Sequence, residues 1–432
     1  MCVSSVRVPS VCVRSSVVAV SPSSPQWWSL RCSRLSRAFY KVRKQGGHVV
    51  AGGATLKYNT ARQCISSAAA SAAPAARVPY ALDNERLAAW VTAPPPEKEV
   101  LRVVSWNVAG MRGMLNNKDK ASEFSALIRR TKPHHLLLQE TKLQHTNVEE
   151  VSEKLNKLRL YEDGSDDTTT VGDVLKHRVW SCSRARKGYS GVAILSTEPH
   201  TWKSASVAAD HNEEISALVE EGRVLTVRDK SGWVVCNAYV PNSGVGLKTI
   251  RRRIDAWEPA LCSHLERSAA GAFVGEVATT SSSSLENETS DAHPYDVEMA
   301  GALSTPVAQD AESKAPRGVV YAGDLNVAMQ PQDLWGNHHK NRKLAGYTDE
   351  ERECAAKLLQ DVQLHDAFRV VHGEDVKAFT YWDYRSKARL ENRGWRIDYT
   401  LVTDADAVLD SFVLDDVQGS DHCPVLVVLS AA

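Results

Sequence analysis

A carboxylate and a carboxamide stand two residues apart in the stretch Gly318-Val-Val-Tyr-Ala-Gly-Asp-Leu-Asn326. Residues 319–322 predict a short buried strand that is bounded by Gly323. If the extended geometry continues, the side chains of Asp324 and Asn326 leave the same face of that strand end. The carboxylate could then take a proton or bind a metal, while the amide orients a water. A plain turn explains this stretch alone equally well, because Gly, Asp and Asn are turn formers.

The same arrangement recurs along the chain, where other apolar runs end in polar residues. Five further segments share it: Val103-Val-Ser-Trp-Asn107, Leu136-Leu-Leu-Gln-Glu140, Val234-Val-Cys-Asn-Ala-Tyr-Val-Pro-Asn242, Trp395-Arg-Ile-Asp-Tyr399 and Gly419-Ser-Asp-His422. Chance would scatter Asn, Glu, Asp, His and Tyr along the chain. Their placement at strand ends instead indicates one site at the edge of a sheet.

Seven motifs in this part of the chain resemble the exonuclease III / apurinic-apyrimidinic (AP) endonuclease family of the endonuclease–exonuclease–phosphatase superfamily. In family order they are Trp106-Asn-Val-Ala-Gly110, Leu138-Gln-Glu-Thr-Lys142, Gly188-Tyr-Ser-Gly-Val192, Tyr239-Val-Pro-Asn242, Gly323-Asp-Leu-Asn-Val327, Gly394-Trp-Arg-Ile-Asp-Tyr399 and Ser420-Asp-His-Cys-Pro424. A lone Ser-Asp-His would be weak, but seven blocks in order are a specific signal. The resemblance implies a deoxyribonuclease I-like, four-layer α/β sandwich of two mixed, mostly antiparallel sheets flanked by helices.

The resemblance also implies an activity. We expect a metal-dependent AP endonuclease of DNA base-excision repair, which hydrolyses the phosphodiester 5′ to an abasic site and leaves a 3′-OH. We further expect 3′-phosphodiesterase and 3′–5′ exonuclease activity. The partner would be double-stranded DNA with abasic or 3′-blocked lesions, and the protein would be a monomer. Mg²⁺ is the expected cofactor, with Mn²⁺ as the alternative, because phosphodiester hydrolysis needs a cation that neutralises charge.

The resemblance assigns metal ligands to five positions. Glu140 is the expected primary ligand, with Asn107 beside it and Asp421 across the site. Asp324 would orient or deprotonate the attacking water, or bind a second metal, and these two roles remain alternatives. Asn326 would assist at the same place by positioning water. A solvated acid at a strand end is the competing interpretation of Glu140.

Further catalytic roles follow from the same resemblance. His422 would bind or protonate the scissile phosphate, and Asp398 would fix its tautomer and raise its pKa. Asn242 and Asn326 would position phosphate and water. Tyr239 would donate to a phosphate oxygen. A buried structural histidine and a core tyrosine are the alternatives for His422 and Tyr239.

Aromatic residues near the C-terminal motifs predict a pocket. Tyr381, Trp395 and Ile397 occupy the positions that line the abasic pocket of AP endonucleases. Enzymes of this kind flip a nucleotide out of the duplex, and a small apolar pocket accepts a sugar without a base. Arg385 is placed where a side chain is inserted beside the lesion.

Two residues depart from the family pattern. Ala109 stands where many animal members have an Asp that contributes to the metal site, which predicts weaker metal binding. Val245 occupies the position where some relatives have an Arg that grips duplex DNA, which predicts weaker retention of the nicked product.

Two other functions compete with this interpretation. A phosphatase, sphingomyelinase or deadenylase of the same superfamily is disfavoured by the Trp395–Tyr399 motif and by the aromatic stretch around Tyr381. A catalytically inactive nucleic-acid-binding module would have lost some of its catalytic residues. The chain instead keeps all four of Glu140, Asp324, Asn326 and His422.

Helices must hold these strand ends in place. Asn147 and Glu150 predict a capping box before an apolar helical face. Apolar residues recur every three or four positions from Leu247 to Leu265, and Pro259 predicts a kink or restart within that helix. Residues 123–130 predict a short helix that stops before Pro133.

The composition changes along the chain. The first 82 residues contain no Asp or Glu but eight Arg and three Lys, as in a mitochondrial transit peptide. A basic arm for nucleic-acid binding or nuclear entry, or a wrongly chosen start codon, is the alternative. We therefore interpret residues 1–97 as an N-terminal extension and 98–432 as the catalytic domain. We expect a nuclear or mitochondrial location.

An acidic, Ser/Thr/Ala/Glu-rich insertion at about residues 268–316 lacks apolar periodicity, which predicts a disordered loop. The chain has a formal net charge of zero, so residues 83–432 carry −11 against +11 in the first 82. Nine cysteines without a CxxC pair favour neither a zinc site nor a disulfide framework. No apolar run approaches the roughly 18 residues that span a bilayer, so we expect no membrane partner.

Overall fold

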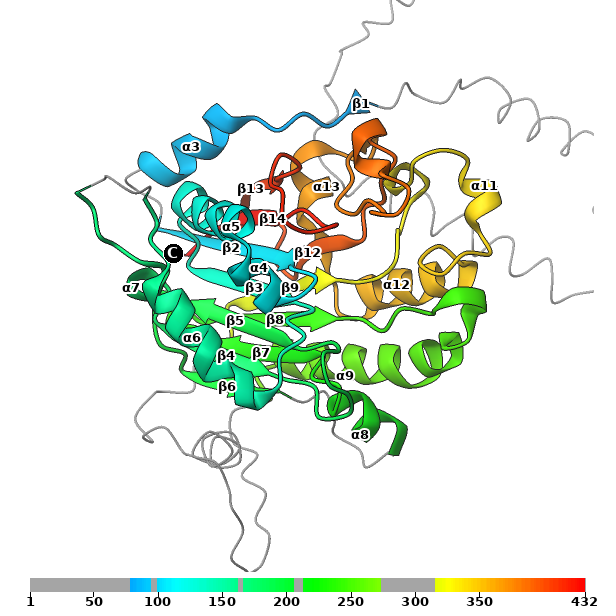
Figure 1. Ribbon diagram of the computed structural model, residues 1–432. Coiled ribbons are helices and arrows are strands. Elements are labelled where there is room, and N and C mark those ends of the chain that lie inside the picture. The colour runs from blue at the N-terminus through cyan, green and yellow to red at the C-terminus, as the bar shows by residue number, and fades with distance from the viewer. Residues whose placement is uncertain (1–77, 95–98, 162–165, 206–212, 273–314, 432) are drawn as a thin grey trace, which may run out of the picture. The chain divides into compact units, whose positions relative to one another are not determined.

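Two six-stranded sheets form the centre of the computed structural model, which describes residues 78–94, 99–161, 166–205, 213–272 and 315–431 (Figure 1). The first sheet has the order β10 (His365–Asp366), β12 (Asp398–Val402), β9 (Gly318–Asp324), β8 (Trp233–Tyr239), β7 (Val224–Arg228), β6 (Trp202–Ser204). The second has the order β13 (Val408–Val413), β14 (Val425–Ser430), β2 (Val100–Asn107), β3 (His135–Gln139), β5 (Val192–Ser196), β4 (His177–Ser181). A separate parallel pair joins β1 (Val78–Pro79) to β11 (Val376–Lys377).

Each six-stranded sheet contains one parallel pair at its centre. β2 runs parallel to β3, with Asn107 opposite Gln139, and β8 runs parallel to β9, with Tyr239 opposite Asp324. The other neighbours in both sheets are antiparallel. Because parallel strands end at the same edge of a sheet, the residues that close these four strands are brought side by side.

Three apolar layers account for the stacking of the sheets and helices. Val103 and Leu137 of one sheet meet Val235 and Val320 of the other, and all four side chains are fully buried. The helices that cover the second sheet are α4 (Met111–Asn116), α5 (Lys118–Thr131), α6 (Val148–Lys157) and α7 (Val171–Val174). Those that cover the first are α8 (Glu213–Val219), α9 (Glu258–Ala269) and α12 (Asp349–Asp361). The predicted four-layer α/β sandwich is confirmed.

Shorter elements complete the fold. Helix α13 (Ala367–His372) lies beside β12 and β13, and α11 (His338–Asn341) lies in the loop before α12. Single 3₁₀ turns occur at His145–Asn147, Val245–Leu247, Pro331–Asp333 and Ala388–Glu391. Among the residues described, no helix is long and apolar enough to span a bilayer.

Helix α6 begins where the sequence predicts it, but the predicted capping box is absent. The 3₁₀ turn runs straight into the helix, so Asn147 has φ −100° and ψ −8° and its side chain makes no capping hydrogen bond. An N-cap side chain normally folds back from an extended backbone. Helix α5 starts earlier than predicted because the Asn117 side chain caps it by accepting from the Lys120 N–H. It ends before Pro133, as expected.

The helix predicted from Leu247 onward does restart at Pro259. A π-helical segment, Arg252–Trp257, leads into α9, and Pro259 occupies the first turn of α9. A proline is tolerated there because the first N–H groups of a helix have no partner within the helix.

Part of the predicted N-terminal extension packs on the catalytic domain. In α3 (Asn84–Thr92), Leu87 is buried, and the Trp90 indole N–H donates to Asp410 Oδ2 at 2.7 Å. Tyr80 packs edge-on against Phe368 with ring centroids 5.3 Å apart. Residues from Tyr80 to Trp90, which the prediction assigned to the extension, therefore pack on the catalytic domain. Residues 1–77 and, within the predicted insertion, residues 273–314 lie outside the described ranges.

Candidate active site

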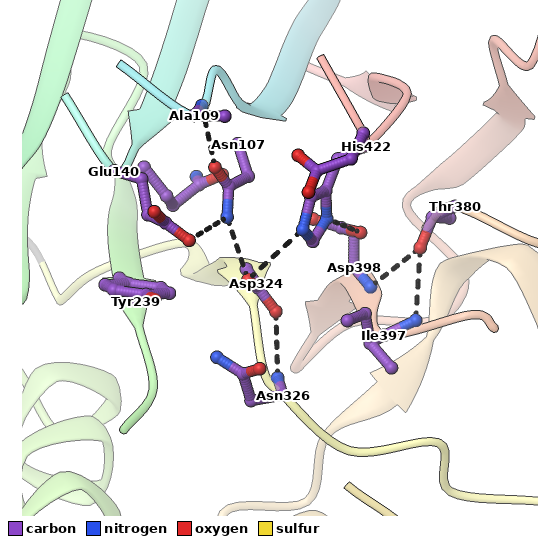
Figure 2. Close-up of polar contacts among 12 residues, drawn as sticks. Asn107, Ala109, Glu140, Tyr239, Asp324, Asn326, Thr380, Ile397, Asp398 and His422 are labelled. Atoms are coloured by element: carbon purple, nitrogen blue, oxygen red, sulfur yellow. Dashed lines mark hydrogen bonds and ion pairs between the residues drawn. The ribbon is translucent and has the colours of Figure 1, made fainter. Parts of the chain in front are cut away.

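The six predicted strand ends converge at one edge of the two sheets (Figure 2). Asp398 opens β12 directly opposite Asp324, which closes β9. His422 precedes β14, and its carbonyl accepts the Trp106 indole N–H from β2 at 3.1 Å. The Ser420 hydroxyl donates to the Asn107 carbonyl at 2.7 Å, which joins the same two segments again. Tyr239 lies beside Asp324 at the end of β8.

The strand geometry of β9 stops at Asp324 and does not extend to Asn326. Asn326 has a left-handed φ of 49°, and its N–H donates to Asp324 Oδ1 at 2.9 Å. This is a side-chain turn, which Asp and Asn form readily. The pair is therefore brought together by a turn after a buried strand, and not by two steps of continued strand. Both residues nonetheless lie in the site (Figure 2).

Gly323 permits an unusually close approach of β8 and β9 just before the site. Its φ is 151°, and a Cβ atom there would lie 1.9 Å from the Ala238 carbonyl oxygen. No L-residue fits that space, because such contacts lie far inside van der Waals distance. The glycine sets how closely the following residues, Tyr239 and Asp324, approach each other.

His422 is held between two buried carboxylates. Its Nδ1 lies 2.8 Å from Asp398 Oδ2, and its Nε2 lies 3.8 Å from Asp324 Oδ2. Asp398 is itself positioned by Thr380, whose hydroxyl oxygen accepts from the backbone N–H groups of Ile397 and Asp398 at 3.1 and 3.0 Å. All three charged side chains are almost completely buried.

Asn107 connects the two halves of the site. Its Nδ2 donates to Glu140 Oε1 at 3.1 Å and to Asp324 Oδ2 at 2.9 Å, while its Oδ1 accepts from the Ala109 N–H at 3.0 Å. Lys142 Nζ lies 2.8 Å from Glu140 Oε2. In this orientation the Asn107 oxygen points away from the carboxylates, so Glu140 and Asp324 present the stronger ligand atoms.

The electrostatics of the site raise the pKa of two neighbouring groups, His422 and Asp324, so that both hold a proton more readily than usual. Burial alone would lower the pKa of His422, but Asp398 and Asp324 raise it to about 10. Burial, together with Asp398 and Glu140, raises the pKa of Asp324 to about 7, against the opposing effect of His422. Burial would also raise the pKa of Glu140, but Lys142 and Asn107 hold it below its usual value.

A second group of polar side chains lies on the other side of Asp324. Asn242 Nδ2 donates to Asn326 Oδ1 at 2.8 Å, and Asn326 Nδ2 donates to the Val240 carbonyl at 2.9 Å. Burial raises the pKa of Tyr239 well above its usual value, and the nearby Glu140 and Asp324 carboxylates raise it further. The tyrosine therefore remains a hydrogen-bond donor.

The predicted pocket residues also gather beside His422. Ile397 is buried in an apolar cluster that includes Leu334, and Tyr381 and Trp395 pack partly exposed against it. Tyr381 forms backbone bridges with both Trp395 and His422, and its ring centroid lies 4.8 Å from that of His422. The aromatic residues Tyr381 and Trp395 and the His422 imidazole are thus held together by direct contacts.

Two predicted site residues stand apart from these contacts. The Asp421 carboxylate is partly exposed, and its Oδ1 accepts from the Ser420 hydroxyl at 3.3 Å. Arg385 is exposed on a turn, where its N–H donates to Asp383. The predicted roles of both, as metal ligand and as inserted side chain, remain predictions.

Several supporting residues were not predicted from the sequence. Buried Arg253 donates to the carbonyls of Leu325 and Asn326 at 2.9 and 2.7 Å, and so fixes the turn after Asp324. Arg396, between the pocket residues Trp395 and Ile397 in the sequence, donates to Asp333 at 2.8 Å. Its place inside the Trp395–Tyr399 motif was the one available signal. Arg253 lies within the apolar helical pattern from Leu247 to Leu265, which does not predict its hydrogen-bond partners.

The donor set fits a divalent cation with oxygen ligands. Among the described residues, one group of three ligating side chains has its ligand atoms within 4.8 Å of one another, namely Asp324, Asp398 and His422. Asp398 Oδ1 is buried and has no hydrogen-bond partner among the described residues. Hard cations prefer carboxylate and carbonyl oxygens, and Glu140 adds another carboxylate nearby.

A family model supports the same assignment as the geometry. The model described as the Endonuclease/Exonuclease/phosphatase family matches residues 104–422. The chain belongs to this family. The matched range runs from β2 to His422 and so contains the whole site, from Asn107 and Glu140 to Asp398. The pocket residues Tyr381, Trp395 and Ile397 also lie inside it.

The names of individual relatives describe nucleases that act on DNA or take part in DNA repair. The exodeoxyribonuclease of Bacillus subtilis (strain 168) is 28% identical over 76% of this chain and 100% of the relative. The DNA repair nuclease APEX1 of Danio rerio is 29% identical over 78% of this chain and 87% of the relative. The solved structure of AP endonuclease LMAP from Leishmania major has a TM-score of 0.58 at 26% identity and covers 82% of this chain and 93% of that one.

Proposed function

We propose that this protein is a metal-dependent AP endonuclease that cuts DNA 5′ to an abasic site. The observation that carries the proposal is the bridge through Tyr381, whose backbone pairs with Trp395 on one side and with His422 on the other. Tyr381 thereby joins the proposed sugar pocket, which includes Trp395, to His422, which would face the phosphate. The names of the relatives, a DNA repair nuclease and an AP endonuclease, agree with this proposal.

His422 acts as a cationic donor to the scissile phosphate. Its raised pKa, about 10, keeps the ring protonated at neutral pH. Nδ1–H donates to Asp398, which leaves Nε2–H for a non-bridging oxygen of the phosphate. A charged donor aimed at developing negative charge stabilises the transition state and needs no reorganisation.

Asp324 acts as the base that orients and deprotonates the attacking water. With a pKa of about 7, its carboxylate is both populated and basic near neutral pH, as a general base requires. Asn107 and the Asn326 N–H hold its two oxygens, so the carboxylate cannot rotate away.

Glu140 would be the primary ligand of a divalent cation, with Asp421 across the site, and we propose that this cation is Mg²⁺ or Mn²⁺. When bound there, the cation would neutralise charge on the phosphate and on the leaving oxygen. Lys142, paired with Glu140 at 2.8 Å, already places one positive charge there.

The remaining polar side chains grip the substrate. Tyr239 donates from its phenol to a phosphate oxygen, and the linked amides of Asn242 and Asn326 bind the phosphate and the water. The same groups can act on a terminal phosphodiester, so we include 3′-phosphodiesterase and 3′–5′ exonuclease activity in the proposal. Arg385, exposed beside the pocket segment, would contact the duplex next to the lesion.

The proposal is tested with a duplex that carries one tetrahydrofuran abasic analogue and with the matched undamaged duplex. We expect incision 5′ to the analogue with Mg²⁺ and none with EDTA. Trp395→Ala should lower kcat/KM on the abasic duplex and weaken discrimination against undamaged DNA, because the excluding wall is gone. Trp335→Ala, at a tryptophan that is 48% exposed, is the control and should change neither.

Two results would contradict the proposal. Absence of incision at the analogue with either metal would reject the endonuclease. An unchanged ratio between the two substrates in Trp395→Ala, with a normal thermal melt, would reject the pocket and favour a less specific phosphodiesterase.

A further inference from the structure

Tyr239 lies directly under a buried guanidinium that the proposed chemistry does not use. The guanidinium carbon of Arg223 lies 4.7 Å from the centroid of the Tyr239 ring. Backbone and side chain join the same two residues, because the Tyr239 N–H donates to the Arg223 carbonyl at 2.8 Å and Arg223 Nη1 donates to the Tyr239 carbonyl at 3.0 Å. A cation over an aromatic face is attracted by the negative face of the ring.

Three acceptors on different segments fix the orientation of Arg223. Besides the Tyr239 carbonyl, its Nε donates to Glu221 at 2.5 Å, and its Nη2 donates to the Tyr189 hydroxyl at 2.7 Å. Glu221 is held in turn by Arg252 Nη1 at 2.6 Å. The Arg223 side chain is only 3% exposed, so water does not compete for these donors. The planar fork therefore has a single orientation.

Tyr189 connects this guanidinium to the loop that follows Glu140. It belongs to the segment Gly188–Gly191, to which no function has so far been attached. Within that segment, the Ser190 carbonyl accepts from the Lys142 N–H at 2.8 Å and the Gly191 carbonyl accepts from the Thr141 N–H at 3.0 Å. A Cβ atom at Gly191 would lie 2.5 Å from Thr141 Oγ1, so the two loops are in direct contact.

The Arg223 guanidinium lies close to two tyrosine rings. The Tyr189 centroid is 5.4 Å from the guanidinium carbon, and the Tyr239 centroid is 4.7 Å from it. One ring belongs to the loop packed against Glu140, and the other ends β8 beside Asp324. The guanidinium thus contacts both the Tyr189 loop, which packs on the loop after Glu140, and Tyr239, which lies beside Asp324.

We propose that Arg223 is a positioning residue that holds the Tyr239 phenol toward the scissile phosphate by clamping its ring against the Tyr189 loop. This inference rests on the proposed function, because it takes Tyr239 to be the phosphate donor. Arg223 acts through Tyr239 and touches no substrate. A phenol that donates to one phosphate oxygen must be held to within a fraction of an ångström, since a misplacement of about 1 Å can cost on the order of 100-fold in rate.

A double-mutant cycle separates positioning from a general structural role. We expect Arg223→Met to reduce kcat roughly 10- to 100-fold on the tetrahydrofuran duplex while KM changes little. In a Tyr239→Phe background, the same Arg223→Met change should have almost no further effect, because its target hydroxyl is already gone. Arg223→Lys keeps the charge but not the fork and should recover only part of the loss.

The control is Arg178→Met. Arg178 also ties down backbone carbonyls, those of Leu175 and Ser152 at 2.9 and 3.1 Å, but it lies on β4 away from the site. It should affect the melting temperature and leave kcat unchanged. Multiplicative losses in the Tyr239→Phe, Arg223→Met double variant would overturn the positioning role and leave Arg223 as a structural residue.

A measurement without substrate keeps the inference testable if the proposed activity fails. The protein is labelled with 3-fluorotyrosine, and the Tyr239 ¹⁹F signal is assigned as the one missing from Tyr239→Phe. Arg223→Met should shift and broaden that signal, because the ring loses its cation and its clamp, whereas Arg178→Met should not. An unshifted Tyr239 signal in folded Arg223→Met would refute the clamp whether or not the enzyme cuts abasic DNA.

Discussion

Strand β3 has a buried histidine–aspartate cluster at each end, and the two clusters behave in opposite ways. At its start, His135 Nδ1 lies 2.7 Å from Ser196 Oγ, and His135 Nε2 lies 3.4 Å from Asp229 Oδ2. Beyond its far end lies the His422–Asp398 pair, with a contact of 2.8 Å. His135 and His422 are equally buried, at 3% and 4% exposed. Burial therefore does not distinguish them.

The two histidines differ instead in the number of carboxylates around the ring, which, among the residues that the structure describes, is two for His422 and one for His135. His422 faces Asp398 and Asp324, which raise its pKa to about 10. At the other end, Asp229 also accepts from the Ser231 hydroxyl and the Trp233 N–H. Burial and cationic neighbours there lower the pKa of His200 to about 4. His422 thus keeps its proton at neutral pH, whereas His200, whose ring centroid lies 6.1 Å from that of His135, does not.

The largest expected difference between the clusters is in catalysis. His422→Asn should lower cleavage of abasic DNA by roughly 10² to 10⁴, the usual worth of such groups. His135→Asn should leave the kcat of the folded enzyme unchanged and cost about 1–3 kcal/mol of stability through lost buried hydrogen bonds. Single-turnover rates and thermal melts of both variants check this. A His422→Asn enzyme within tenfold of wild type would remove His422 from the mechanism.

The two aspartate partners give a smaller and sharper contrast. Asp398→Asn removes the carboxylate that is hydrogen-bonded to the imidazolium and leaves Asp324 as its charged neighbour. We expect a loss of about 10- to 100-fold in kcat, as for other groups that orient a functional histidine. Asp229→Asn should lower the melting temperature only. Comparable catalytic losses in both would show that the clusters are coupled through β3, against the contrast drawn above.

Two partly buried histidines near His135, namely His134 and His200, predict a loss of stability in acid. Burial lowers the pKa of His134 and of His200 to about 4, from 6.5. Between these values the unfolded chain binds protons that the folded chain refuses, so unfolding becomes easier as pH falls from about 6.5 to about 4. Thermal melts in EDTA over this pH range should show the loss of stability. His200→Gln should reduce the slope of stability against pH. His365→Gln, at an exposed histidine, should leave the slope as it is.

The smallest expected effect concerns the residue that departs from the family pattern. Ala109 has a left-handed φ of 51°, and its carbonyl accepts from Lys142 Nζ at 3.3 Å, beside Glu140. Ala109→Asp should add a carboxylate to the charged cluster and lower the Mg²⁺ concentration needed for half-maximal rate. Ala109→Gly relieves the same backbone strain without adding charge. Equal Mg²⁺ requirements in the two variants would mean that the carboxylate adds nothing.

Residues at strand ends could be predicted from the sequence because two local signals coincide there. An apolar run followed at once by Glu140 or Asp324 marks both the strand and its functional edge. The four-layer fold was predicted through the family resemblance, which the motifs at these strand ends carry. The site roles inferred from the family resemblance placed His422 and Asp398 together, as the structure does.

Residues that act through long-range contacts could not be predicted in this way. The clamp on Tyr239 joins Arg223 to Tyr189 across two loops, and the remote cluster joins His135 to Asp229 between two sheets. Neither pair has a spacing that a helix or a strand would impose. The Asn147 cap failed for a related reason, because the conformation of the preceding turn, and not the residue type, decides whether the side chain can fold back.

Gly323, the next-to-last residue of β9, sets the spacing between the ends of β8 and β9. Because Gly323 has no side chain, its backbone can lie against the carbonyl of Ala238, and the strand ends that carry Tyr239 and Asp324 lie correspondingly close. Any larger side chain would widen that spacing and displace Tyr239 and Asp324 together. A substitution at this single position would therefore lower activity through misplacement alone, while leaving each catalytic group chemically intact.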